Sequence, residues 1–149
     1  MAKPSAFQFS NPILEKISFN LNDNPELETG KLSLKFGTTD FEDDGSGGKS
    51  AKARLIISNE DTELTNPKEQ LPYEFSVTYT AVFHWSSSDI SDDQASKLLY
   101  VNGQALLLSY FRPIINTVVR ASGAPNFNLP FIDFRDDGPI EKLKNKNNQ

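Results

Sequence analysis

The strongest pattern in the chain is an alternation of apolar and polar residues between Tyr73 and Trp85. All seven odd positions carry Tyr, Phe, Val, Ala or Trp, and the even positions are polar except for Val82. A period of two sustained over this length predicts a strand with one apolar face. Shorter stretches with the same period occupy 13–21, 32–36 and 51–57. Because connections without a helical pattern join these segments, the chain predicts a four-stranded antiparallel sheet.

The first of these segments is expected to be half-buried, since four apolar residues share one side of it. They are Ile13, Ile17, Phe19 and Leu21, with Glu15 as the single interruption. The connection 37–50 is rich in Asp, Ser and Gly and is expected to be mobile. Its GSGGKS stretch lacks the first glycine and the following helix of a phosphate-binding loop, so that function is rejected.

Helical patterns after the last strand are expected to cover the sheet. Ser91-Asp92-Asp93-Gln94 is a capping box that predicts a short helix up to the interruption at Asn102-Gly103. A longer helix is predicted over 104–121, closed by Gly123 and kinked at Pro113. Its polar stripe consists of Ser109, Arg112, Asn116 and Arg120. The predicted fold class is therefore α+β, with the antiparallel sheet packed by a long helix from the C-terminal half and by short helices.

An unusual apolar segment follows the long helix. Five of the eight residues at 127–134 are large and hydrophobic, and Pro130 among them opposes a regular helix or strand. The five are Phe127, Leu129, Phe131, Ile132 and Phe134. They either fold back onto the sheet as core or form an exposed groove or oligomer surface. The sequence leaves both possibilities open.

Length and composition narrow the function classes. With 149 residues, the chain is expected to form one domain over 1–149, with flexible ends at 1–5 and 136–149. A net charge of -5 and no run of clustered Lys and Arg argue against binding to nucleic acid. The chain has no Cys, no secretory signal pattern and no run near the ~20 apolar residues of a membrane span. A cytoplasmic protein without membrane insertion is expected.

Residues suited to catalysis are sparse. His84 is the one histidine, and without a second His or a Cys it has no companion for a metal site. No GxSxG motif accompanies the serines, and the acidic pairs lie in loops or at a helix start. We therefore predict a protein that is not an enzyme and needs no cofactor or metal.

The segment LLxSYxRxIIxxVVRASGxPxFNLPxIDF resembles the C-terminal half of the SecB chaperone family. The matching residues are Tyr110, Arg112, Ile115, Val119, Pro125, Asn128, Leu129 and Phe134. Phe7-Gln8-Phe9 and Ile17-Ser18-Phe19 look like the first strand of the family, and Leu32-x-Leu34 looks like the second. The resemblance covers most of the chain from Phe7 to Phe134.

This resemblance implies an ATP-independent holdase that binds unfolded or precursor polypeptides and assembles as a homotetramer, a dimer of dimers. The implied client-binding residues are Leu32, Leu34, Phe36, Phe127, Leu129, Phe131, Ile132 and Phe134. The implied oligomer interface on the long helix consists of Tyr110, Arg112, Asn116 and Arg120. An alternative is a structural or adaptor protein that reuses the same fold for fixed protein–protein assembly.

The chain departs from the family at the acidic positions that dock the translocase ATPase in protein export. Lys16, Asn20 and Ser76 stand at those positions. The departures weigh against this partner and tilt slightly toward a dedicated client, such as an antitoxin from a toxin–antitoxin pair, whereas the resemblance itself implies a role in export. The sequence leaves both client classes open.

Overall fold

Strand β6, Tyr73–Ser86, is the longest strand and has a neighbour on each side. The computed structural model describes residues 3–21, 33–59, 73–124, 132, 134 and 135. On one side β6 pairs with β5, Gly48–Ser58, and on the other it pairs with both β1, Phe7–Phe9, and β2, Ile13–Leu21. All of these pairings are antiparallel.

The far side of β5 carries the remaining two strands, β3, Ser33–Thr38, and β4, Glu42–Asp43. In the part of the chain that the structure describes, the sheet therefore has six strands where four were predicted. The difference arises because each outer position is shared by two segments, β1 with β2 and β3 with β4. The predicted α+β class and antiparallel sheet are confirmed, and the four predicted segments correspond to β2, β3, β5 and β6.

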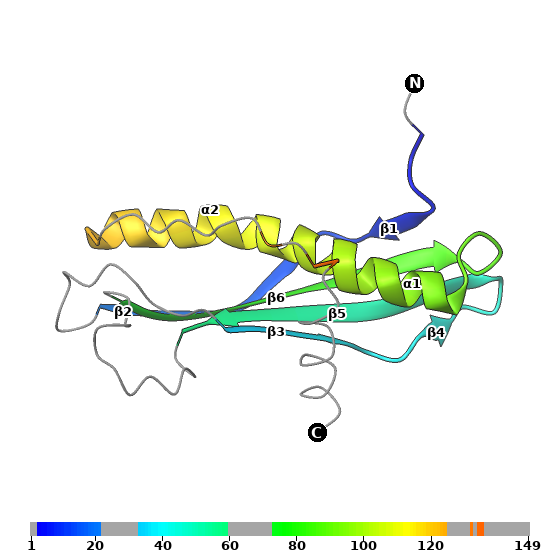
Figure 1. Ribbon diagram of the computed structural model, residues 1–149, viewed down its shortest axis with the longest axis horizontal. Helices are drawn as coiled ribbons and strands as arrows, with labels where there is room; N and C mark the ends of the chain where they lie inside the picture. Colours follow the sequence, from blue (N-terminus) through cyan, green and yellow to red (C-terminus); the bar gives the residue numbers. More distant parts are fainter. Residues whose placement is uncertain (1–2, 22–32, 60–72, 125–131, 133, 136–149) are drawn as a thin grey trace.

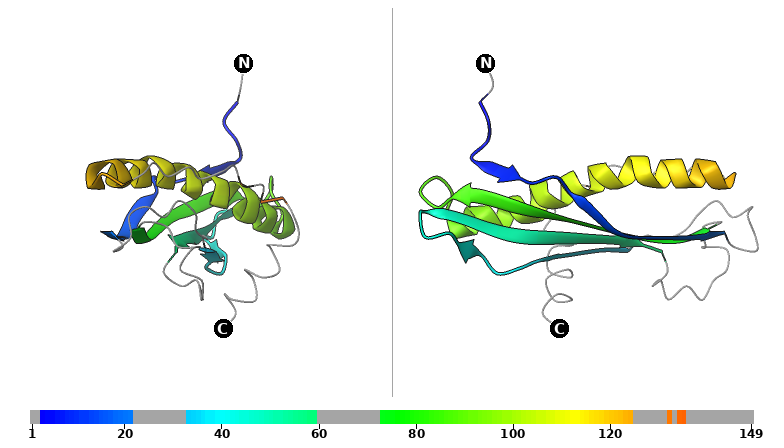
Figure 2. Two further views of the ribbon diagram at one scale, coloured as in Figure 1. Left: turned by 60° about the vertical axis from the view of Figure 1, so that its left-hand side comes forward. Right: turned by 180° about the vertical axis from the view of Figure 1, so that it is seen from behind.

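A helical layer covers one face of the sheet (Figure 1; Figure 2, left). It consists of α1, Asp92–Leu98, the π-helical turn Leu99–Gly103 and α2, Gln104–Ser122. The odd-numbered residues of β6 are all buried beneath it, as the alternation predicted. Phe111 of α2 stacks on Phe75 of β6 with their ring centroids 5.8 Å apart. This contact joins the two layers.

The helix boundaries agree with the sequence signals at both ends and differ in the middle. Ser91 and Gln94 form the predicted capping box, and Gly123 closes α2 with a φ of 78°. The predicted interruption at Asn102-Gly103 is wrong, because a π turn joins α1 to α2 without a break. Pro113 lies inside α2, which continues on both sides of it.

The π turn has a packing reason. Buried positions recur every four residues at Ala95, Leu99, Gly103 and Leu107, a spacing that drifts around a helix of 3.6 residues per turn. A wider turn returns these positions to the side that faces the sheet. A Cβ atom at Gly103 would lie 3.5 Å from the Phe83 ring, an ordinary van der Waals distance, so the helix backbone at this turn packs directly against the sheet.

The connection 37–50 was expected to be mobile, but it folds into a hairpin. Glu42 pairs with Ser50 and Asp43 with Lys49. In the turn, the Asp44 carboxylate accepts hydrogen bonds from the Ser46 amide at 2.8 Å and the Gly48 amide at 3.0 Å. Hydrogen bonds from the Ser46 amide and hydroxyl, and from Gly48, hold the pKa of Asp44 below its usual value. The Asp44-Gly45 turn therefore orders the connection, although its composition predicted mobility.

A β-bulge in β2 changes the side on which its residues lie. The register shifts between Leu14 and Lys16, so that Leu14 lies opposite Tyr79 whereas Ile13 lies opposite Thr80. Ile13 thus points to the face away from the helices, and the prediction that it shares a side with Ile17 is wrong. Ile17 lies opposite Val77 on the helix side.

Replacing Phe111 with Ala should destabilise the fold strongly, because its fully buried ring stacks on Phe75. We expect the free energy of unfolding in urea to fall by about 3–5 kcal/mol. Thr117→Ala on the exposed side of the same helix is the control and should change it by less than about 0.5 kcal/mol. Equal effects of the two substitutions would contradict the described packing.

Tyr73 should make stability depend on pH in the alkaline range. Burial raises the pKa of its phenol from the ordinary value of 10.0 to about 12. The native state therefore keeps this proton where the unfolded state loses it, so the stabilisation is complete below pH 10 and declines as the pH rises to about 12. We expect Tyr73→Phe to flatten the fall in unfolding free energy over this range by an amount on the order of 2 kcal/mol. Tyr110→Phe, at an exposed ring, is the matched control for the loss of a phenol hydroxyl.

Candidate functional site

An exposed apolar surface runs along the edge of the sheet formed by β1 and β2 and continues onto α2. Its members, here called the apolar ledge, have relative exposures between 38% and 52%: Phe9, Leu14, Ile17, Leu21 and Tyr110. Monomeric proteins seldom expose contiguous apolar surface of this kind without a function for it. The ledge is therefore a candidate for contact with another chain.

The pairing of β2 with β6 puts the strand residues of the ledge on the helix side of the sheet. Leu14, Ile17 and Leu21 lie opposite Tyr79, Val77 and Tyr73, which are all buried beneath the helices. Tyr110 reaches the same region from α2, with its ring centroid 6.3 Å from that of Tyr79. The helical layer covers β6 but leaves the neighbouring edge strand uncovered, so the apolar residues of β2 remain exposed.

The predicted interface residues on α2 occupy its surface. Tyr110, Asn116 and Arg120 are exposed, and Arg112 is half-buried. The buried side of the same helix consists of other residues: Gln104, Leu107, Leu108, Phe111, Ile115 and Val119. The four predicted residues are thus accessible for subunit contact, and that role stays a prediction.

The predicted client-binding residues lie deeper. Phe36 and Phe134 are each only 4% exposed and belong to the hydrophobic core. The Phe36 ring packs edge-on against Tyr100 of the π turn, with ring centroids 5.9 Å apart. Leu34 and Ile132 are half-buried and pack against that core. The other four, Leu32, Phe127, Leu129 and Phe131, lie outside the described residues.

The opposite face of the sheet, which we call the outer face, carries basic residues that the sequence did not show as a cluster. Lys16 comes from β2, Lys35 from β3, and Lys52 and Arg54 from β5. The strand register brings them together, since Ile56 lies opposite both Lys35 and Thr78, and Thr78 lies opposite Lys16. They are far apart in sequence and only the strand pairing reveals the cluster.

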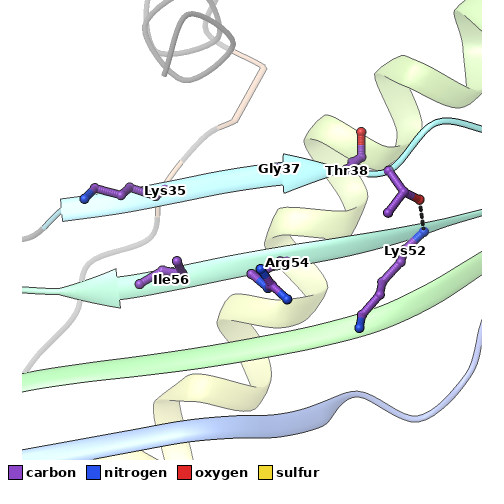
Figure 3. Close-up of a pocket in the computed structure, with 7 residues that line it drawn as sticks. Lys35, Gly37, Thr38, Lys52, Arg54 and Ile56 are labelled. Atoms are coloured by element: carbon purple, nitrogen blue, oxygen red, sulfur yellow. Dashed lines mark hydrogen bonds between the residues drawn. The ribbon is translucent and has the colours of Figure 1, made fainter. Parts of the chain in front are cut away.

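A hollow of about 350 Å³ lies among these cations. Figure 3 shows it from the side away from α2, with Lys35, Lys52 and Arg54 on adjacent strands. The residues around it include Gly37, Thr39 and Ile56. The missing side chain at Gly37, between Lys35 and Thr39 on β3 and its continuation, leaves this space open.

Glu15, the residue at the bulge, provides a negative charge on the outer face. Its carboxylate lies 3.4 Å from the Lys52 Nζ and 3.4 Å from an Arg54 guanidinium nitrogen. Desolvation acts to raise the pKa of Glu15, but the Thr80 hydroxyl, Lys52 and Arg54 outweigh it and hold the pKa below its usual value. One insertion in β2 thus directs a carboxylate to the outer face and leucine to the ledge.

Within the described part of the chain, no three His, Cys, Asp or Glu side chains lie close enough together to hold a metal ion. His84 is exposed, opposite Gln8 and Ser50 on the outer face, as its even position in β6 predicted. No described helix combines the length and apolarity that crossing a membrane requires.

Exposed apolar side chains along one sheet edge are typical of surfaces that contact other polypeptides. A family model described as "Preprotein translocase subunit SecB" matches residues 8–136 of the 149. The chain therefore belongs to the SecB family. The resemblance seen in the sequence is confirmed, and membership of this chaperone family agrees with the prediction of a chaperone that is not an enzyme.

Among solved structures, the chain is similar to a SecB-like chaperone of Mycobacterium tuberculosis, determined in complex with a peptide from an antitoxin. The two chains are 14% identical, the match covers 85% of this chain and 91% of the other, and the TM-score is 0.49. No curated protein sequence matches the chain. The family assignment rests on the family model alone.

Proposed function

We propose that this chain is an ATP-independent holdase that binds unfolded polypeptides and assembles into a tetramer. The match to the SecB family over residues 8–136 is the observation that carries this proposal. The exposed apolar side chains of the ledge support the proposal, because a chaperone that assembles needs apolar surface both for its own copies and for clients.

Client binding is assigned to the eight residues that the sequence predicted. Of the described members, Leu34 and Ile132 are half-buried and accessible, whereas Phe36 and Phe134 lie beneath the surface. Leu34 is on β3, which among the described strands pairs only with β5. An extended client could therefore combine apolar burial, at about 25 cal/mol per Å², with strand-like backbone pairing.

The proposed clients are unfolded or precursor polypeptides in protein export, in keeping with the description of the family model. A dedicated client such as an antitoxin is the alternative. Docking of the translocase ATPase through acidic residues of the outer face is not part of the proposal, because that face carries Lys16, Lys35, Lys52 and Arg54.

The holdase proposal is tested by suppression of aggregation of a chemically unfolded model protein without ATP. We expect the wild-type chain to suppress aggregation and the double variant Leu34→Asp with Ile132→Asp to need roughly ten times more chain for the same effect, since two desolvated carboxylates oppose apolar binding. Val82→Asp adds one such charge on the outer face and is the control for each single substitution. Urea unfolding of each variant separates lost binding from lost folding.

Two outcomes would redirect the proposal. A wild-type tetramer that fails to suppress aggregation at several-fold excess supports the structural or adaptor alternative. Suppression restricted to one antitoxin, with none for export precursors, supports the dedicated client. The same assay with both client classes therefore decides between them.

Assembly is assigned to the apolar ledge together with the α2 residues Tyr110, Arg112, Asn116 and Arg120. Tyr110 belongs to both sets, so the two surfaces are continuous. Two copies that meet along β2 and α2 would cover side chains that a single chain leaves exposed. Each fully buried Leu, Ile or Phe contributes about 1.5–3 kcal/mol relative to full exposure, and these half-exposed residues contribute a fraction of that.

Light scattering tests the assembly. We expect a tetramer for the wild type and smaller species for Ile17→Lys with Leu21→Lys, because two charges would be placed in a covered apolar contact. Ile13→Lys is a matched control on the same strand, since the bulge turns this residue to the outer face where it is 63% exposed. A ledge variant that stays tetrameric but loses client binding would instead assign the ledge to clients.

A further inference from the structure

The middle of the outer face has a charge opposite to that of the chain as a whole. The net charge is -5, yet Lys16, Lys35, Lys52 and Arg54 gather there with the Glu15 carboxylate among them, whereas Glu74 and Glu42 lie toward the ends of the face, opposite Asn20 and Ser50. The Lys52 side chain is 47% exposed and that of Arg54 is 53% exposed, so both cations remain accessible to solvent. A concentration of positive charge on an acidic protein favours an anionic ligand there.

The hollow at Gly37 lies next to these cations and offers space for a ligand. Glu15 lies on the β2 side of Lys52 and Arg54, 3.4 Å from each, whereas Gly37 lies opposite Arg54 on the β3 side. Figure 3 shows the Lys52 side chain extending from β5 away from β3. The space of about 350 Å³ over Gly37 therefore adjoins the cations on the side that Glu15 does not occupy. Its size is near the lower end of the ~300–1,000 Å³ range of ligand sites.

The spacing of the cations suits a row of carboxylates better than a single compact anion. Lys52 and Arg54 are two residues apart on one face of β5, about 7 Å along the strand. Lys35 lies opposite Ile56 on the neighbouring strand, about 5 Å across and a further ~7 Å along from Arg54. Alternate side chains of an extended peptide repeat at the same distance of about 7 Å. Glu15 shows that a carboxylate can contact Lys52 and Arg54 together.

We infer that the outer face binds an acidic segment of a partner protein in extended form, with its carboxylates on Lys35, Lys52 and Arg54 and one of them in the hollow at Gly37. The partner is distinct from the client. The helix-side residues Leu34 and Ile17 lie on the other face of the sheet, so a client and the acidic partner can be bound together. The inference thus goes beyond the holdase proposal and does not depend on it.

An acidic polypeptide fits this face better than a nucleic acid. Even-numbered β6 residues and their neighbours in register supply Ser, Thr, Val, Ile and His there, and no described Phe, Tyr or Trp of the paired strands lies on the outer face in register. Binding of single strands usually relies on aromatic stacking. The net charge of -5 also repels a dense polyanion more strongly than a short acidic segment.

The test measures binding of a labelled, end-capped peptide of alternating Glu and Ser to the full-length protein by fluorescence anisotropy at low salt. We expect saturable binding that weakens as salt increases, because exposed ion pairs are screened. The double variant Lys35→Gln with Arg54→Gln should weaken binding about tenfold, the sum of two exposed ion pairs. Gly37→Val, which fills the hollow without changing charge, should also weaken it.

Lys97→Gln on α1 removes one positive charge, as Arg54→Gln alone does, so it is the control for that single variant and should bind the peptide as the wild type does. Equal loss in Lys97→Gln and Arg54→Gln would reduce the effect to net charge and overturn the proposed site. An oligonucleotide that displaces the peptide and binds tighter would assign the face to nucleic acid instead. Suppression of aggregation is measured on the same variants and should be unchanged, so failure of this inference and failure of the holdase proposal are distinguishable.

Discussion

The packing of one helical layer against one face of β6 is the contact on which the rest of the molecule depends. β6 is the only described strand that joins the two halves of the sheet, because β1 and β2 reach the others through it. Its aromatic and aliphatic odd positions supply the floor of the core, and Phe111 on Phe75 fixes the helices over that floor. Every surface of interest is then defined by what this layer covers or leaves bare.

The helical layer covers only the middle of one face of the sheet, so the two faces differ in the residues that they expose. On the helix side, Tyr110 of α2 packs beside Tyr79 of β6. The apolar residues of β2 next to them remain exposed. On the outer side there is no described helix, and the exposed strand residues are polar or charged apart from Ile13 and Val82. A chain that self-associates through one face can therefore keep the other in solvent. This arrangement allows assembly and recognition to be controlled separately.

Much of the fold was predictable because its signals are local. The alternation from Tyr73 to Trp85, the capping box at Ser91 and the glycine at 123 each act within a few residues, and all three predictions hold. The continuous helix through Gly103 was not predictable from Asn-Gly, because the turn packs against residues of another element, Phe83 among them, which the local sequence does not encode. Local chemistry therefore identified the elements, and tertiary packing decided how they join.

The candidate surfaces were harder to predict for a related reason. The resemblance to the family pointed to α2, whose named residues are accessible, but it said nothing of the cations on the outer face. Lys35 and Lys52 become neighbours only through strand register, which no single segment encodes. The exposed ledge was missed because a bulge is needed to place Leu14 on the helix side. Leu34 and Phe36 lie on the same side of β3, so the sequence pattern does not distinguish them. Only the structure shows that Phe36 is buried in the core whereas Leu34 is half-buried.

The bulge at Glu15 determines which residues of β2 lie on each face of the sheet, so the two faces depend on the number of residues in this one strand. With one residue fewer, the N-terminal part of β2 would exchange its sides, sending Ile13 toward the helices and Leu14 toward the cations. Substitutions can alter either face by itself, whereas an insertion or deletion here must alter both at once. During divergence, the composition of the assembly surface and the charge of the opposite face can therefore change in a single coupled step.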